Sequence, residues 1–167
     1  TGHTEEAGYC LVTSAERDGM RLIAVVLGTA SKLARKEESR KMLGYGFRFY
    51  ETPKVLTAGQ SLSDPPVKVW KGAADTVRLG VTRDVHVTVP RGRAAELKAA
   101  YVIDEAHRAI EAPVEAGAVV GAVTVSLGEE AMLQEPLVTL DGVERGGFFA
   151  VFWDSVVLFF LKLFGQA

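Results

Sequence analysis

The sequence predicts an α+β protein made of a strand pair with a helix, a small antiparallel β sandwich or barrel, and an amphipathic C-terminal helix. Three observations carry this prediction. Two long β-rich runs enclose an Asp-Gly pair near the N-terminus. Short β-patterned runs separated by turn residues fill the middle. The last segment, residues 146–167, carries only Asp154 and Lys162 as charged side chains. We therefore expect domains at residues 1–51, 52–146 and 147–167.

The first part begins with a predicted β hairpin. Its strands cover residues 9–15 and 20–28, and the pair Asp18-Gly19 between them is a strong signal for a tight turn. The second strand is almost wholly apolar, so we expect it to be buried on both faces. Burial of both faces, and of the apolar face of the helix that follows, requires further parts of the domain. We therefore expect residues 1–51 on their own to leave a large apolar surface exposed.

A helix is expected after the hairpin, from an N-cap at Ser31 to about Phe49. Two glycines, Gly44 and Gly46, weaken its last turns. The large apolar residues should be buried, and the Lys, Arg and Glu side chains should lie outside. The expected buried residues are Leu33, Met42, Leu43, Tyr45, Phe47 and Phe49.

The middle part reads as several short strands between turns. In residues 84–89, apolar and polar residues alternate strictly, which is typical of a strand with one buried face. Residues 94–103 fit a strand or a helix equally well. A second hairpin is predicted around Gly128. Its two strands are residues 119–127 and 132–140, and the other predicted strands of the middle part are residues 67–70 and 77–81.

The C-terminal segment is the most unusual in composition. On a helical projection, its polar residues Asp154, Ser155 and Lys162 share one narrow sector. Two charges disfavour a helix that spans a bilayer, whereas a helix lying in the plane of a membrane surface fits the pattern. The alternative is a helix docked on the core of its own domain. The predicted membrane-contacting residues are Phe148, Phe149, Phe152, Trp153, Phe159, Phe160 and Phe164.

Net charge, cysteine content and the residues near His107 argue against several kinds of partner and site. A net charge of −2 argues against a nucleic-acid partner. The single cysteine, Cys10, excludes an internal disulfide and is expected to be a small buried apolar residue. Acidic residues near His107 do not provide the three or four converging ligands of a zinc site. We therefore expect no metal and no cofactor.

Four stretches together resemble the D-alanyl-D-alanine carboxypeptidases, which are low-molecular-mass penicillin-binding proteins of the bacterial cell envelope. Each stretch alone is unspecific, but their combination is specific and extends over essentially the whole chain. The resemblance implies that the strand pair and helix belong to a penicillin-binding, β-lactamase-like transpeptidase domain. The stretches are TGHTEEAGY (residues 1–9), MRLI (20–23), GFRFYET (46–52) and VPRGR (89–93).

The resemblance implies a serine acyl-transfer enzyme that removes the terminal D-Ala from peptidoglycan stem pentapeptides and is the target of β-lactam antibiotics. Its Lys-Thr-Gly box corresponds here to Thr1 and Gly2, which would bind substrate. The backbone N–H of His3 would form part of the oxyanion hole. Arg35 corresponds to an arginine that lines the family's site and would bind the substrate carboxylate.

The departures from the family pattern are as informative as the match. The lysine of the box would precede Thr1, and the chain has no Ser-x-x-Lys motif to supply the nucleophile. We therefore expect a C-terminal portion of an enzyme that is inactive alone. Its expected location is the periplasmic side of the cytoplasmic membrane, held there by the C-terminal helix. The alternative function is a non-catalytic membrane-tethered β module that binds partner proteins or peptidoglycan.

Overall fold

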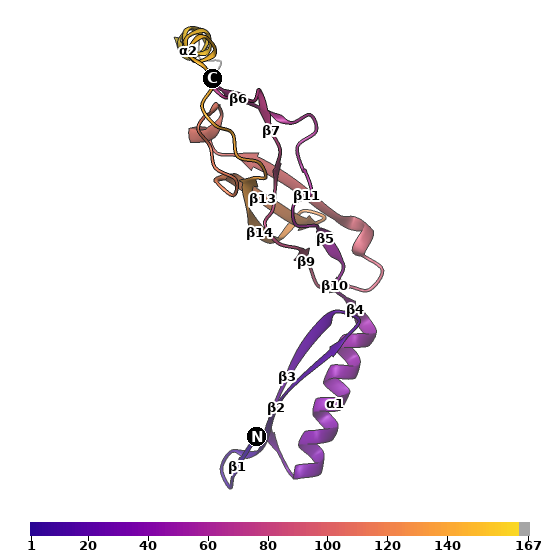
Figure 1. Ribbon diagram of the computed structural model, residues 1–167. Coiled ribbons are helices and arrows are strands. Elements are labelled where there is room, and N and C mark those ends of the chain that lie inside the picture. Colours follow the sequence, from indigo (N-terminus) through magenta and orange to yellow (C-terminus); the bar gives the residue numbers. More distant parts are fainter. Residues whose placement is uncertain (164–167) are drawn as a thin grey trace. The chain divides into compact units, whose positions relative to one another are not determined.

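The computed structural model describes residues 1–163, without the side chains of residues 149, 150 and 158–163. The described chain divides into two compact units. The first consists of residues 1–53 and 87–96, and the second of residues 54–86 together with the described chain from Leu97 onward (Figure 1). The segment 87–96 thus groups with the first unit, although it lies inside the range 52–146 predicted for the β-rich domain.

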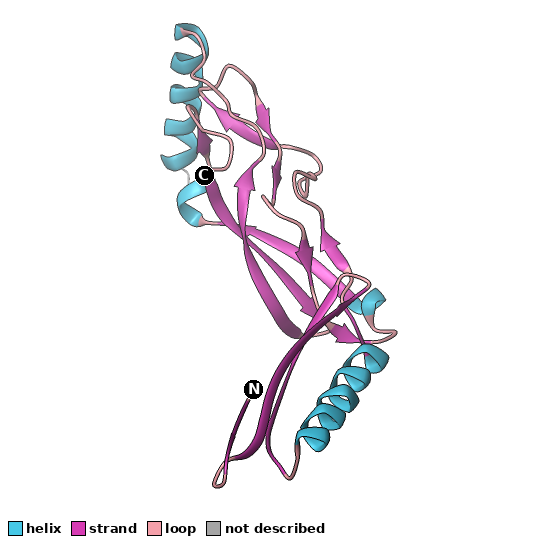
Figure 2. Ribbon diagram, turned by 60° about the horizontal axis from the view of Figure 1, so that its bottom comes forward, coloured by secondary structure: helices cyan, strands magenta, loops and turns pink. Residues whose placement is uncertain are grey.

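The first unit is an antiparallel sheet with one helix packed against it. Its helix α1 packs on strands β2 and β3 (Figure 2). The sheet has the order β1-β2-β3, and a separate short pair joins β4 to β10. The elements are β1 (Gly2–Thr4), β2 (Gly8–Arg17), β3 (Met20–Thr29), α1 (Lys32–Phe49), β4 (Tyr50–Glu51), β10 (Val89–Pro90) and the 3₁₀ helix η1 (Ala94–Glu96).

The predicted hairpin is confirmed. Arg17 pairs with Met20 at the end of the β2–β3 ladder, so Asp18 and Gly19 form a two-residue loop. Their φ angles are 51° and 77°. Two successive left-handed residues are what a type I′ turn requires, and Asp-Gly adopts them at little cost.

The apolar strand β3 is buried on one face only. Ala24 and Val26 are buried. Ile23, Val25 and Leu27 are 68%, 51% and 69% exposed. The prediction that this strand is buried on both faces is therefore wrong for the described chain, because α1 covers only one side of the sheet. The exposed apolar residues of β3 agree with the expected open apolar surface; the behaviour of residues 1–51 on their own stays a prediction.

Helix α1 begins as predicted, but its buried face differs from the expected one. The Ser31 Oγ accepts a hydrogen bond of 3.0 Å from the Ala34 N–H, which confirms the N-cap. The face against the sheet follows the spacing Ser39, Leu43, Phe47, of which Ser39 and Phe47 are buried. The other expected core residues are exposed, because they lie on the sides of the helix that have no neighbouring element in the described chain. These exposed residues are Leu33, Met42, Tyr45 and Phe49.

The helix runs through both glycines that were expected to weaken it. A Cβ atom on Gly46 would clash with Cδ1 of Leu22 on β3. A side chain at this position would therefore require the Leu22 side chain to shift. The close packing against Leu22 accounts for a glycine at a site where helix propensity alone disfavours it.

The second unit is rich in short, mostly antiparallel strands, which confirms its predicted β-rich character. Its largest sheet has the order β11-β13-β14-β8, and smaller sheets join β12-β6-β7 and β5-β9. The predicted second hairpin is present as β13–β14. The strands are β5 (Lys54–Leu56), β6 (Val67–Trp70), β7 (Thr76–Val77), β8 (Leu79–Gly80), β9 (Val85–His86), β11 (Leu97–Ile103), β12 (Ile110–Glu111), β13 (Val119–Leu127) and β14 (Glu130–Thr139). The unit also contains the 3₁₀ helix η2 (Glu105–His107) and helix α2 (Phe148–Leu163).

The core of the second unit lies beneath its four-stranded sheet. Alternate residues of β13 point inward, and Val123 and Val125 are fully buried together with Leu137 of β14 and Leu79 of β8. The ambiguous residues 94–103 form η1 followed by strand β11. The burial of every second residue along β13 is typical of a strand with one face toward the core.

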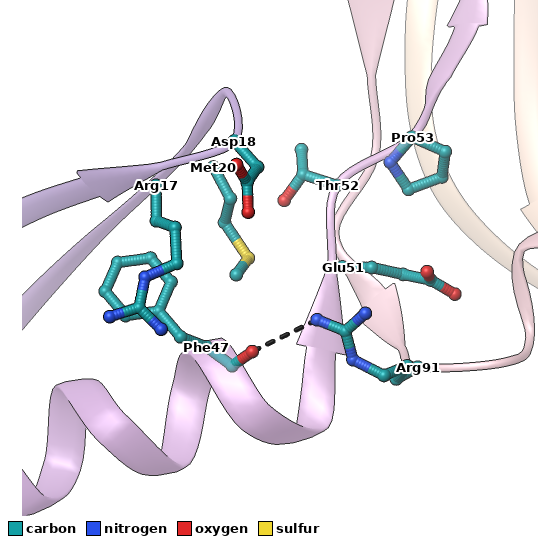
Figure 3. Close-up of a pocket in the computed structure, with 8 residues that line it drawn as sticks. All are labelled: Arg17, Asp18, Met20, Phe47, Glu51, Thr52, Pro53 and Arg91. Atoms are coloured by element: carbon teal, nitrogen blue, oxygen red, sulfur yellow. Dashed lines mark hydrogen bonds between the residues drawn. The ribbon is translucent and has the colours of Figure 1, made fainter.

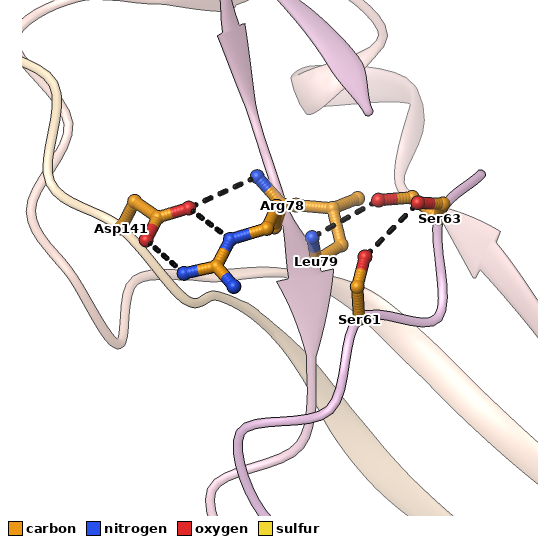
Figure 4. A network of polar contacts seen from close by, with 5 residues as sticks. All are labelled: Ser61, Ser63, Arg78, Leu79 and Asp141. Carbon is orange, nitrogen blue, oxygen red and sulfur yellow. Dashed lines mark hydrogen bonds and ion pairs between the residues drawn. The ribbon is translucent and has the colours of Figure 1, made fainter. Parts of the chain in front are cut away.

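Two polar contacts hold β8 at the end of this sheet (Figure 4). Arg78 donates to Asp141 through Nε at 2.9 Å and Nη2 at 2.6 Å. The Leu79 N–H donates to the buried Oγ of Ser63 at 3.1 Å. The hydrogen bond from Arg78 lowers the pKa of Asp141 below its ordinary value.

The Arg78–Asp141 contact gives stability a small acid dependence. Because folding lowers the pKa of Asp141, the contribution is present above the unfolded-state pKa, about 3.9, and is lost as the pH falls through the folded-state pKa. We expect Asp141→Asn to lower the melting temperature by no more than about 4 °C at pH 7, since the pair is exposed. The difference from wild type should vanish at pH 2.

Thermal unfolding followed by circular dichroism at pH 7 and pH 2 checks this expectation. Asp104→Asn is the matched control, because Asp104 is exposed and its side chain makes no capping hydrogen bond. A difference between Asp141→Asn and wild type that is as large at pH 2 as at pH 7 would contradict the assignment.

Candidate functional site

The predicted site residues lie on an outer strand of the first unit. Strand β1 pairs with β2 so that Gly2 faces Cys10 and His3 faces Tyr9. Within the described residues, β1 has a neighbouring strand on one side only. Thr1, Gly2 and His3 are all exposed. An edge of this kind offers backbone N–H and C=O groups to an extended peptide.

Arg35 connects the first turns of α1 to this strand. Its Nη1 donates to the carbonyl oxygens of Gly2 at 3.0 Å and Cys10 at 3.1 Å. These two residues are opposite each other in the β1–β2 ladder, so one guanidinium nitrogen holds both strands. The structure therefore brings Arg35 next to Gly2, although 33 positions separate them in the sequence.

The ring of Tyr9 lies close to two of the predicted site residues, His3 and Arg35. Its ring centroid is 3.8 Å from that of His3 and 5.6 Å from the guanidinium carbon of Arg35. Tyr9 is not among the predicted site residues. Its cross-strand position opposite His3 could have been predicted from the turn at residues 5–7, which the Ala7 N–H closes onto the Thr4 Oγ1 at 3.0 Å.

The hydroxyl and thiol groups near β1 serve the local structure. The Ser31 Oγ caps α1, and the Thr29 Oγ1 donates to the Tyr9 carbonyl oxygen at 2.9 Å. Cys10 is half-buried, with Sγ 3.5 Å from the Ala7 carbonyl oxygen. What the site presents is a cation and a strand edge, which suit recognition of an extended peptide that carries a carboxylate.

A second arginine fixes the opposite end of α1, and the sequence analysis gave it no role (Figure 3). Arg91 donates through Nη2 to the carbonyl oxygens of Phe47 and Tyr50, at 3.1 and 3.2 Å, and through Nε to that of Arg48 at 3.1 Å. The last carbonyls of a helix lack intrahelical partners and carry the negative end of its dipole. Arg91 therefore satisfies the C-terminus of the helix that positions Arg35.

Residues 87–96, which include Arg91, make two more polar contacts within the first unit. The Gly92 N–H donates to the Glu51 Oε1 at 2.7 Å, and the Thr52 and Thr88 hydroxyls are 2.9 Å apart. Glu51, Thr52 and Arg91 also line a pocket of about 290 Å³. Its lining residues are Arg17, Asp18, Met20, Phe47, Glu51, Thr52, Pro53 and Arg91.

The predicted membrane-contacting residues other than Phe164 lie on α2. Phe148, Phe152 and Trp153 are 80%, 59% and 68% exposed. The side chains of Phe149, Phe159 and Phe160, and the whole of Phe164, lie outside the described part of the structure. Within residues 1–163, no helix combines the length and apolarity needed to cross a bilayer.

Comparison with known families decides which family these features belong to. The sequence model of the penicillin-binding protein 5 C-terminal domain matches residues 50–145. The chain belongs to the penicillin-binding protein 5 C-terminal domain family. A second model, that of the D-alanyl-D-alanine carboxypeptidases, matches residues 1–31, which include β1 and the β2–β3 hairpin.

Curated relatives and solved structures agree with this membership of the penicillin-binding protein 5 family. The chain is 42% identical to the D-alanyl-D-alanine carboxypeptidase DacA of Escherichia coli K12 over 99% of its own length, and 41% identical to DacC of the same strain over 99%. It spans about 40% of the length of these relatives. The structure of penicillin-binding protein 5 from Haemophilus influenzae matches with a TM-score of 0.75 and 37% identity, covering 86% of this chain and 41% of that one.

The contacts of Arg91 with the last turn of α1 should be measurable in stability. We expect Arg91→Ala to lower the free energy of unfolding by about 1–2 kcal/mol, because it leaves helix carbonyls without a charged donor. Arg40→Ala, at an exposed position of the same helix, should change it by less than about 0.5 kcal/mol. Urea unfolding followed by circular dichroism measures both. Equal effects of the two substitutions would show that Arg91 makes no special contribution.

Proposed function

We propose that this chain is the C-terminal part of a serine D-alanyl-D-alanine carboxypeptidase, which removes the terminal D-Ala from peptidoglycan stem pentapeptides and is inhibited by β-lactams. The observation that carries the proposal is the contact between Arg35 and the carbonyl of Gly2. It places a cation beside an outer strand whose sequence matches the carboxypeptidase family. In this proposal, residues 1–51 belong to the catalytic domain, 52–146 form the second domain, and 147–167 form the membrane helix.

Each residue of the candidate site has a distinct proposed role. The Thr1 hydroxyl and the Arg35 guanidinium bind the terminal carboxylate of the substrate, and Gly2 leaves room for the peptide to lie against the strand. The His3 backbone N–H donates to the oxygen of the scissile carbonyl, whose charge develops only in the tetrahedral state. Among the described residues, the Nε and Nη2 of Arg35 have no hydrogen bond assigned, so these donors are available to substrate.

The covalent step requires groups that this chain does not supply. In the proposed reaction a serine hydroxyl attacks the carbonyl of the penultimate D-Ala, and a lysine accepts its proton. The peptide bond breaks as this proton passes to the amine of the leaving terminal D-Ala, and water then hydrolyses the ester to the serine. Both groups belong to a Ser-x-x-Lys motif that we place in a preceding part of the polypeptide. The contribution of this chain is therefore recognition of the substrate and stabilisation of the oxyanion.

The C-terminal helix suits attachment to a membrane surface, and we place the protein on the periplasmic face of the cytoplasmic membrane. The support is the exposure of Phe148, Phe152 and Trp153 on one described stretch of α2. Large apolar side chains exposed together on a helix are typical of interfacial helices, in which Trp lies near the lipid headgroups.

The enzyme assignment is tested with a fluorescent penicillin, which acylates the serine of such enzymes. We expect the product of the complete gene to be labelled and this chain alone to remain unlabelled. In the complete protein, Arg35→Ala should reduce kcat/KM for a D-Ala-D-Ala peptide about 10- to 100-fold, because a charge-assisted contact to the carboxylate is lost. Arg35→Lys should recover part of the loss.

The matched control is Lys36→Ala, which removes an exposed cation one residue away on the same helix. It should leave kcat/KM within about twofold of wild type, as expected for a surface substitution. A complete protein that is not labelled by penicillin would overturn the enzyme assignment. If residues 52–146 then bind peptidoglycan fragments saturably, the non-catalytic membrane-tethered module would be the better description.

The membrane assignment is tested by flotation with liposomes that contain anionic lipid. Replacing Phe148 and Phe152 with Asp should abolish flotation, because each ring contributes about 1.5–3 kcal/mol when it leaves water. Val102→Asp is the control, since Val102 is an exposed apolar residue of the same unit outside α2. Unchanged flotation of the double variant would show that α2 does not hold the chain on lipid.

A further inference from the structure

The turn after β6 makes an unusual set of contacts with the C-terminal helix. We call residues 70–72 the Lys71 turn. Lys71 has a φ of 59°, in the left-handed region that residues other than glycine rarely adopt. Its backbone N–H donates to the Asp154 Oδ2 of α2 at 2.6 Å, across 83 positions of sequence. Its carbonyl oxygen accepts from the Gly146 N–H at 2.8 Å.

These two contacts hold α2 at two points along the chain. Gly146 lies just before the helix begins, and Asp154 lies in its second turn. The approach to the helix is fixed as well, because the Ala73 N–H donates to the Glu144 carbonyl oxygen at 2.8 Å. A helix held at its entry and again in its second turn cannot rotate freely about its own axis.

The Asp154 contact selects which side of α2 faces away from the β-rich unit. At 100° per residue, Phe148, Phe152 and Trp153 lie about 100° to 160° around the helix from Asp154. These three aromatic residues are exposed, whereas Asp154 is partly buried. Val151 and Val157, on either side of Asp154 in projection, are also partly buried. The polar side of the helix is thus directed toward the protein.

This arrangement differs from that of an interfacial helix whose polar side faces water. There, the polar residues are solvated and the rest of the protein is attached only through the preceding linker. Here, a carboxylate of the polar side is bound by a backbone N–H of the β-rich unit, in a charge-assisted hydrogen bond. The helix therefore lies against the β-rich unit, next to β6 (Figure 1).

We propose that Asp154 is a positioning residue that docks α2 on the Lys71 turn, both free in solution and when the aromatic side of the helix contacts lipid. The docked helix then fixes which part of the β-rich unit stands next to the membrane surface. The lipid-bound half of this inference rests on the membrane assignment proposed above. The docking half does not depend on it.

Hydrogen–deuterium exchange at the Lys71 backbone amide, read by mass spectrometry on the full chain, tests the docking. We expect Asp154→Ala to accelerate exchange of this amide about tenfold or more, since its hydrogen bond to a carboxylate is lost. Asp154→Asn should retain most of the protection, because its amide oxygen can accept the same bond. Ser155→Ala is the matched control, since the Ser155 Oγ donates only to the Val151 carbonyl oxygen of its own helix.

The same measurement on vesicles of phosphatidylethanolamine and phosphatidylglycerol tests the lipid-bound half. Unchanged protection of Lys71 in vesicle-bound wild-type protein supports the proposal. Exchange that rises on binding to the level of Asp154→Ala overturns it, because the helix has then left the unit. Equal exchange in wild type and Asp154→Ala in solution also overturns it. Wild-type protein that protects Lys71 yet does not bind vesicles upholds the docking and refutes the membrane assignment.

Discussion

The candidate site depends on one arginine that binds two strands at once. By donating from a single nitrogen to the carbonyls of Gly2 and Cys10, Arg35 holds β1 against β2 and places its own charge at the strand edge. A three-residue strand with a partner on one side contributes little stability by itself. Its position therefore depends on α1, and α1 in turn is held at its C-terminus by Arg91. The proposed substrate-binding edge is thus supported from both ends of one helix.

A charged side chain also holds an element in the second unit, but there it is the carboxylate Asp154 and not an arginine. Arg35 and Arg91 bind backbone carbonyls, whereas Asp154 binds a backbone N–H of the Lys71 turn. In each case a charged side chain makes a hydrogen bond with a backbone group of another element, and such hydrogen bonds are stronger than those between neutral groups. The contacts of Arg35, Arg91 and Asp154 thus hold strand β1, the C-terminus of α1 and helix α2.

Local elements were predictable because their signals lie within a few residues. The Asp18-Gly19 turn and the Ser31 N-cap each join partners three positions apart, so a short stretch of sequence contains both partners. Burial was less predictable. The apolar composition of β3 indicates a strand with apolar surroundings, but α1 covers one face only, and Ile23 and Leu27 remain exposed. Large apolar residues of α1 were wrongly predicted to be buried, because the size of a side chain does not show which side of a helix packs on the sheet.

The amino-acid sequence by itself determined the hairpin, the helix that follows it, the β-rich middle part and the family resemblance that singled out Gly2, His3 and Arg35. Only the tertiary structure decided how these residues meet, and it alone revealed Tyr9, Arg91 and the contact of Asp154 with Lys71. The physical reason is sequence separation: Arg35 lies 33 positions from Gly2, and Asp154 lies 83 positions from Lys71. Contacts of this range depend on how strands and helices pack, which periodicity and local propensity do not encode.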